Sequence, residues 1–179
     1  MSSVQQQWEY LCAHIGNVLF PAYCLGCHAP STLLCKRCAA ALHRPPAKCL
    51  LCARPVLGGI CRTCSSVSAI ARIDAYAPYS DPLARALIGH LKYQFEHALA
   101  APIGHAVATL LNNPDKDSVL VPIPLHPRKF RERGFNQSAL IAKYAGVALN
   151  VPVDTSFGIQ RSVYTYPQAR TTSKKERRQ

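Results

Sequence analysis

The 179-residue sequence predicts an α/β protein in which a cysteine-rich module precedes a parallel sheet with flanking helices. Cysteine pairs are concentrated in residues 24–64, and from residue 73 onward short apolar runs alternate with helix-like segments. Hydrophobic residues make up 49% of the chain, which is enough for one ordinary domain with a small appendage. We therefore expect three parts: an amphipathic helix in residues 1–20, the cysteine-rich module in residues 21–68 and the α/β domain in residues 69–179.

Eight of the nine cysteines form four Cys-x-x-Cys pairs. Two thiolates three positions apart can hold one edge of a tetrahedral zinc ion, and a second pair completes a closed Cys₄ site. Four pairs therefore predict two structural Zn²⁺ ions in a double zinc ribbon; disulfides and an iron–sulfur cluster are the alternatives. We favour pairing of the first pair with the second and of the third with the fourth, although crossed pairing stays open. The predicted zinc ligands are Cys24, Cys27, Cys35, Cys38, Cys49, Cys52, Cys61 and Cys64.

The N-terminal segment has the pattern of an amphipathic helix. Within residues 3–19, Trp8, Leu11 and Ile15 share one face, and the ninth cysteine, Cys12, lies on the same face. The polar face lacks Lys and Arg, so we expect this helix to dock on a neighbouring domain rather than on a membrane surface.

The part after residue 68 reads as alternating strands and helices. Asp81-Pro82 is a good pair for the N-cap and first position of a helix, and Asn136 is a good N-cap. The expected elements are a strand at 73–79, a helix from 82, a helix at 102–111, a strand at 119–123, a helix at 137–149 and an apolar run at 151–153. In the last helix we expect Leu140, Ile141, Tyr144 and either Val147 or Ala148 to face the core.

Residues 119–138 join an apolar run to a helix start through a Pro-rich, Arg-rich turn. A helix N-terminus presents free N–H groups and partial positive charge, and basic side chains just before it favour phosphate as the guest. A solvated basic loop that binds nothing in particular is the alternative. The candidate anion-binding residues are Arg128, Lys129, Arg131, Arg133, Gly134 and Asn136.

The net charge of +12 favours an anionic partner, either nucleic acid or a phosphorylated small molecule. Eight zinc-bound thiolates and two Zn²⁺ ions would leave about +8 of that charge. No apolar run reaches the roughly 18 residues of a membrane span, and no secretory leader pattern is visible at the N-terminus. We therefore expect a cytoplasmic protein, and the cysteine pairs suit metal in a reducing compartment.

Several of these stretches resemble the ComF competence family of phosphoribosyltransferase-like proteins. The resemblance rests on Val121-Pro122-Ile123-Pro124, on Arg133-Gly134-Phe135-Asn136-Gln137, on Leu91-Lys92-Tyr93, on the double cysteine ribbon and on Arg161 with residues 165–168. It implies a type I phosphoribosyltransferase-like parallel sheet behind the zinc ribbon. It also implies a role in DNA uptake during natural competence, with single-stranded DNA and competence proteins as partners.

The chain departs from the family pattern where the donor substrate would bind. In phosphoribosyltransferases of this type the resemblance implies two adjacent acidic residues and a Thr/Gly loop, yet no two acidic residues of this sequence are adjacent. The segment most similar to that acidic pair and loop is Val153-Asp154-Thr155-Ser156, which we interpret as a strand end or turn. We therefore expect an incomplete domain that lacks the donor-binding C-terminal segment, and we predict no catalytic residue. Binding of Mg²⁺ with phosphoribosyl diphosphate is expected only if the domain is completed.

Three functions follow from these patterns. The leading hypothesis is a ComF-like protein that binds single-stranded DNA or a phosphorylated ligand through the basic loop. A genuine phosphoribosyltransferase acting on a base or amine is the second hypothesis, to be tested by reading the DNA beyond codon 179. A zinc-ribbon adaptor for nucleic acid or protein is the third, which DNA binding by residues 1–68 alone would favour.

Overall fold

The computed structural model describes residues 21–43, 48–56, 59–70, 72–111, 114–156 and 158–164. The predicted N-terminal helix at 3–19 and residues 165–168 lie outside these ranges. The described elements are α2 (Lys36–Leu42), α3 (Arg62–Ser66), α4 (Pro82–Tyr93), the 3₁₀ helix η1 (His97–Leu99), α5 (Ala100–Ala108), α6 (Pro127–Arg133) and α7 (Gln137–Leu149).

The cysteine-rich module is an internal duplication. The first cysteine repeat (residues 21–43) and the second cysteine repeat (residues 48–70) each begin with an antiparallel bridge, Tyr23 to Pro30 and Lys48 to Pro55. Each repeat closes its first knuckle with the same hydrogen bond, which spans 2.9 Å from Cys24 N to Ala29 O and 2.8 Å from Cys49 N to Arg54 O. A short helix, α2 or α3, then starts directly after the third cysteine of each repeat.

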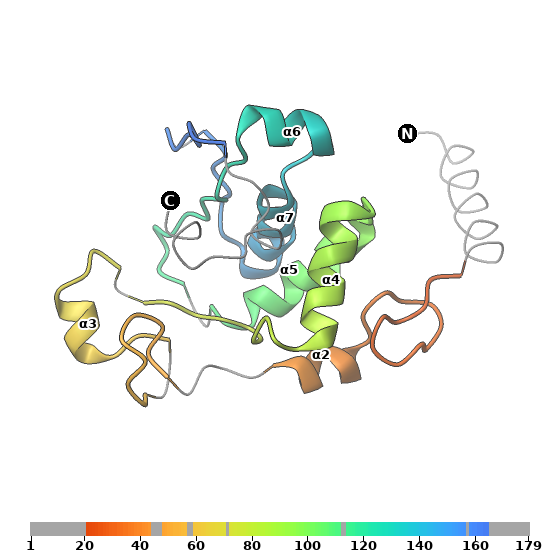
Figure 1. Cartoon of the computed structure of the whole chain (residues 1–179), viewed down its shortest axis with the longest axis horizontal. Coiled ribbons are helices and arrows are strands. Elements are labelled where there is room, and N and C mark those ends of the chain that lie inside the picture. The colour runs from red at the N-terminus through yellow and green to blue at the C-terminus, as the bar shows by residue number, and fades with distance from the viewer. Residues whose placement is uncertain are drawn as a thin grey trace.

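The two repeats differ in how they meet the rest of the chain. Leu34 and Leu42 of the first repeat are buried in one core with Leu87 and Leu91 of α4. In the second repeat, by contrast, Leu50 and Leu51 are about half exposed. In Figure 1, α2 lies at the lower end of α4, and the second repeat with α3 projects to one side of the helices. The first repeat therefore belongs to the helical core, and the second is attached to it.

Helices α4, α5 and α7 lie close to where the sequence predicts them. The carboxylate of Asp81 accepts from Leu83 N and Ala84 N at the start of α4, which confirms the predicted cap. The helix predicted at 102–111 is α5, which begins and ends slightly earlier. The prediction for α7 is confirmed at both ends, and Asn136 caps it through a bond from Ser138 N.

Helices α5 and α7 pack closely at one glycine. A methyl group at Gly104 would lie 2.6 Å from Tyr144 Cβ and 2.8 Å from Ile141 O. Leu140, Ile141 and Tyr144 pack against the core as predicted. Neither alternative for the fourth core position is confirmed, because Val147 is 78% exposed and Ala148 is exposed as well.

The predicted parallel sheet is wrong for the residues that the structure describes. These residues contain helices and three isolated β-bridges, and they contain no strand. The expected strand at 73–79 forms no bridge to another described segment, and the runs at 119–123 and 151–153 share a single parallel bridge, Leu120 to Val153. Fold class is therefore corrected from α/β to a helical core with a duplicated cysteine module.

Proline explains why the one parallel bridge does not grow into a ladder. The bridge consists of Leu120 N to Pro152 O, 2.9 Å, and Asp154 N to Leu120 O, 3.0 Å. The next bond toward the C-terminus would need an N–H from residue 122, and the next bond in the other direction would need one from residue 152. Both positions are proline and have no N–H, so the ladder stops on both sides.

Candidate functional site

The structure gathers the eight predicted zinc ligands into two groups of four. Within each group the ligand atoms all lie within 4.8 Å of one another, and the groups follow the sequential pairing that the sequence favoured. The first group is Cys24, Cys27, Cys35 and Cys38, and the second is Cys49, Cys52, Cys61 and Cys64.

The sulfur spacing fits a tetrahedral zinc site. Four sulfurs at the usual Zn–S bond length lie about 3.8 Å apart. The Sγ atoms of Cys27 and Cys35 are 3.6 Å apart, and those of Cys52 and Cys61 are 3.7 Å apart. These distances are far longer than the roughly 2 Å of a disulfide bond. The two clusters are therefore compatible with two structural zinc ions.

The thiols of each cluster differ strongly in acidity. Burial raises the pKa of Cys24, but backbone hydrogen bonds, chiefly from Cys35, outweigh it and lower the pKa to about 6. The equivalent Cys49 has its pKa lowered to about 6 mainly by a backbone hydrogen bond from Cys61. The last thiol of each cluster keeps its proton, because shared hydrogen bonds with its neighbours raise the pKa of Cys38 and of Cys64 to about 12. Zinc binding must displace such protons, so it weakens as the pH falls.

Each cluster also places an arginine beside its second cysteine. Arg54 Nε donates to Cys52 Sγ over 3.4 Å, and the backbone N–H and side chain of Arg54 together lower the pKa of Cys52. A backbone hydrogen bond from Ala29 and a side-chain hydrogen bond from Arg37 lower the pKa of Cys27 in the same way.

The predicted basic turn is largely a helix, α6. His126 caps it by accepting from Arg128 N through Nδ1, 3.1 Å, and Gly134 ends it at φ 78°, the left-handed conformation that favours glycine. Glu132 lies 3.7 Å from Arg128 Nε, in an exposed ion pair, and 3.6 Å from Lys129 Nζ, whose side chain is partly buried. The basic residues thus occupy fixed positions on a helix rather than a loop.

The structure divides the predicted anion ligands between two sides of α6. Lys129 and Arg133 line one cavity, and Arg131, Gly134 and Asn136 line another of about 790 Å³. Arg128 lines neither of these two cavities. The side chain of Asn136 is engaged at both ends, since Nδ2 donates to Ile123 O and Oδ1 accepts from Ser138 N. The six predicted residues therefore do not form one site.

The basic cavity, as we call the one containing Lys129 and Arg133, has a volume of about 480 Å³ and lies at the N-terminus of α7. Lys92 of α4, Arg161 and Gln137 also line it. Burial and the positive charge of Arg133 lower the pKa of Lys92, and burial lowers the pKa of Arg133. The cavity therefore brings cations together from three separate parts of the chain.

Gln137 is the least expected member of this group. Its side chain is 5% exposed, and its Nε2 has no hydrogen-bond partner among the described residues. A buried amide without a partner costs stability, so such a donor is a mark of a site that a ligand completes. Sequence reasoning missed Lys92 and Gln137 because one is about 40 residues away and the other is an ordinary helix position. The one available signal was that both belong to stretches that carry the family resemblance.

Two tyrosines lie against the same basic residues. The guanidinium of Arg133 lies 5.7 Å from the Tyr93 ring centroid, and Tyr93 is 58% exposed. The Tyr164 ring lies 4.9 Å from Arg128 Cζ and 5.1 Å from Lys129 Nζ. The sequence separates these partners by more than 30 positions, so the contacts are visible only in the structure.

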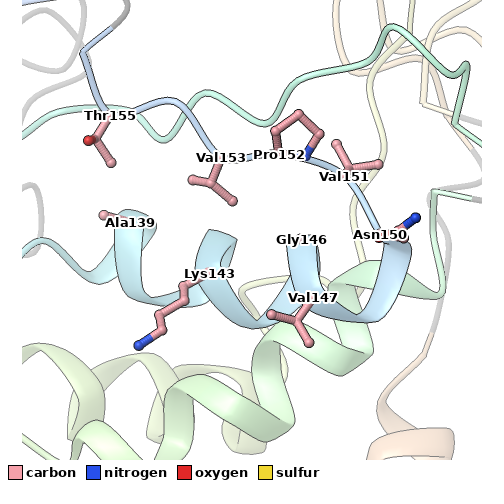
Figure 2. Close-up of a pocket in the computed structure, with 9 residues that line it drawn as sticks. All are labelled: Ala139, Lys143, Gly146, Val147, Asn150, Val151, Pro152, Val153 and Thr155. Atoms are coloured by element: carbon pink, nitrogen blue, oxygen red, sulfur yellow. The ribbon is translucent and has the colours of Figure 1, made fainter.

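Another hollow lies between α7 and residues 151–155 (Figure 2). Lys143 is the one charged side chain among the nine residues drawn, and it extends away from residues 151–155. None of the predicted anion ligands lines this hollow. At its end Asp154 Oδ1 accepts from Ser156 N, 2.7 Å, which confirms the predicted turn there.

Comparisons with known proteins do not assign the chain to a family. No family model matches it, and neither a curated protein nor a solved structure is significantly similar to it. Across the described ranges, no helix has the length and apolar character that a bilayer crossing requires. The two Cys₄ groups are the only clusters of three or more potential metal ligands that the described residues form.

Proposed function

We propose that this chain is a ComF-like, zinc-stabilised protein that binds single-stranded DNA at the basic cavity and the tyrosines beside it. The observation that carries the proposal is the buried, unpartnered Nε2 of Gln137 in a cavity that Lys92 and Arg133 also line. A phosphate oxygen accepts hydrogen bonds from an amide and from cationic groups alike, and the N-terminus of α7 adds its own partial positive charge.

The chemistry around the cavity favours a nucleic-acid strand over a free anion. Single-stranded binders combine a positive groove for the backbone with aromatic rings on which bases stack. Tyr93 offers an exposed ring next to Arg133, and Tyr164 lies next to Arg128 and Lys129. A role in DNA uptake during competence is supported by the sequence resemblance, and the net positive charge agrees with an anionic polymer as partner.

The two zinc ions have a structural role in this proposal. The eight cysteines are used in closed groups of four, so a bound zinc would keep no open position for substrate. The first repeat supplies Leu34 and Leu42 to the core on which α4, and with it Lys92, is packed. Zinc at the first site therefore supports the basic cavity from a distance.

The test is fluorescence anisotropy of a labelled oligothymidylate with the zinc-loaded full chain at several salt concentrations. Arg133→Ala should weaken binding about tenfold, as expected for one lost charge-assisted hydrogen bond. It should also reduce the slope of log K against log salt by about 0.7. Arg131→Ala, on the same helix but outside the basic cavity, should have a smaller effect, and Lys116→Ala in an exposed loop should have almost none.

Two results would count against the proposal. Equal effects of Arg133→Ala and Lys116→Ala would mean that binding reflects net charge and not a site. Tight binding of phosphoribosyl diphosphate without measurable binding of the oligonucleotide would move the small phosphorylated ligand ahead.

A further inference from the structure

An arginine of the second cysteine repeat contacts one of the predicted zinc ligands. Cys27 and Cys52 hold equivalent positions, as the second cysteine of the first knuckle in each repeat. In the second repeat, Arg54 lies in the same knuckle turn and donates from Nε to Cys52 Sγ over 3.4 Å.

The first repeat has no arginine at the position equivalent to Arg54. That position is Ala29, 25 residues earlier. The contact between Arg54 and Cys52 is therefore a feature of the second repeat and not of the shared knuckle pattern.

We propose that Arg54 is a positioning residue that retains zinc at the second Cys₄ site, through the hydrogen bond from its Nε to the Cys52 thiolate. A zinc ion with four thiolates carries a net charge of −2 in total. Outer partners of metal ligands orient them and tune the metal, and a guanidinium also offsets this charge. The hydrogen bond occupies a sulfur lone pair that would otherwise be open to a proton or to attack, so it slows loss of the ion.

The two sites should not lose zinc at equal rates. Cys52 is exposed and its neighbours Leu50 and Leu51 are about half exposed, whereas Cys27 is half-buried in the repeat that belongs to the core. Water and a chelator reach the Cys52 sulfur more easily. We therefore expect the second site to lose zinc first, and Arg54 to control the rate.

The test compares zinc release to a chromogenic chelator from the zinc-loaded full chain and from single variants. Arg54→Gln should accelerate the faster of the two release phases several-fold, and Arg54→Lys should recover part of the loss because it keeps the charge. The slower phase, from the first site, should not change in either Arg54 variant. The matched control is Arg62→Gln, which removes an exposed arginine from the second repeat next to Cys61.

A spectroscopic measurement separates an outer contact from a general loss of structure. In the ¹¹³Cd-substituted protein each site gives its own resonance, so Arg54→Gln should shift the signal of the second site and leave that of the first site in place. Release from Arg54→Gln at the rate of Arg62→Gln would overturn the proposal. So would Cd resonances that Arg54→Gln does not move.

Discussion

At the scale of single residues, Gln137 lowers the stability of the free protein but contributes to binding. Its amide is buried with an unpaired Nε2, and that arrangement is unfavourable in the free protein. A neighbouring side chain could have satisfied the donor, yet the groups that share the cavity with it include Lys92 and Arg133, which only donate. The site therefore contains donors in excess, and an acceptor from outside is what completes it.

Gln137→Met should therefore have opposite effects on stability and on binding. The change keeps the volume and removes the unpaired amide, so the free energy of unfolding should rise by about 1–3 kcal/mol. Affinity for oligothymidylate should fall, because one donor to phosphate is lost. Urea unfolding and anisotropy on the same preparation check both effects, and a variant that loses stability and keeps its affinity would contradict our assignment of Gln137.

At the scale of elements, the helices were predictable and the sheet was not. The starts of α4 and α7 could be predicted from local sequence. Asp81 and Asn136 are N-caps that accept hydrogen bonds from backbone N–H groups only two or three residues later, and Pro82 follows Asp81 directly. The apolar runs at 119–123 and 151–153 have the composition of strands, but whether a ladder grows depends on register. Register places Pro122 and Pro152 at the two donor positions that would extend it, and that information comes from the pairing of two distant segments.

The same contrast between local and long-range information separates the cysteine module, which was predictable, from the basic cavity, which was not. Cys-x-x-Cys spacing predicted both ligand sets, since each knuckle is a local motif. The basic cavity is assembled from α4, α6 and the start of α7, so the sequence supplied Lys129 and Arg133 but not Lys92 or Gln137. It also grouped Arg131 with Arg133, although they line different cavities.

The crossing of α5 and α7 gives a matched pair of glycine substitutions. Gly104→Ala should destabilise the protein by about 1–3 kcal/mol, because the new methyl group meets Tyr144 Cβ and the backbone of Ile141. Gly89→Ala in α4 should be neutral or stabilise by up to about 1 kcal/mol, since nothing lies within 4 Å of the added methyl group. Thermal unfolding checks the pair, and equal shifts would contradict the close crossing.

At the scale of the whole molecule, the two zinc sites should differ in their effect on stability. Cys24→Ser should remove the first zinc and release Leu34 and Leu42 from the core, at a cost of about 3–6 kcal/mol for two buried leucines. Cys49→Ser, at the equivalent position of the second repeat, should remove one zinc and leave the helical core intact. Metal content with thermal unfolding followed by circular dichroism checks this, and equal losses of stability in both variants would contradict it.

Photochemical cross-linking tests the DNA-binding proposal most directly, because it reports where the strand lies. A single strand containing 5-bromodeoxyuridine is bound to the zinc-loaded chain, irradiated and digested, and the adducts are located by mass spectrometry. We predict adducts at Tyr93 and Tyr164, the rings beside the basic cavity. Adducts confined to residues 48–70 would contradict this placement and would make the second cysteine repeat, not the basic cavity, the DNA-binding part of the chain.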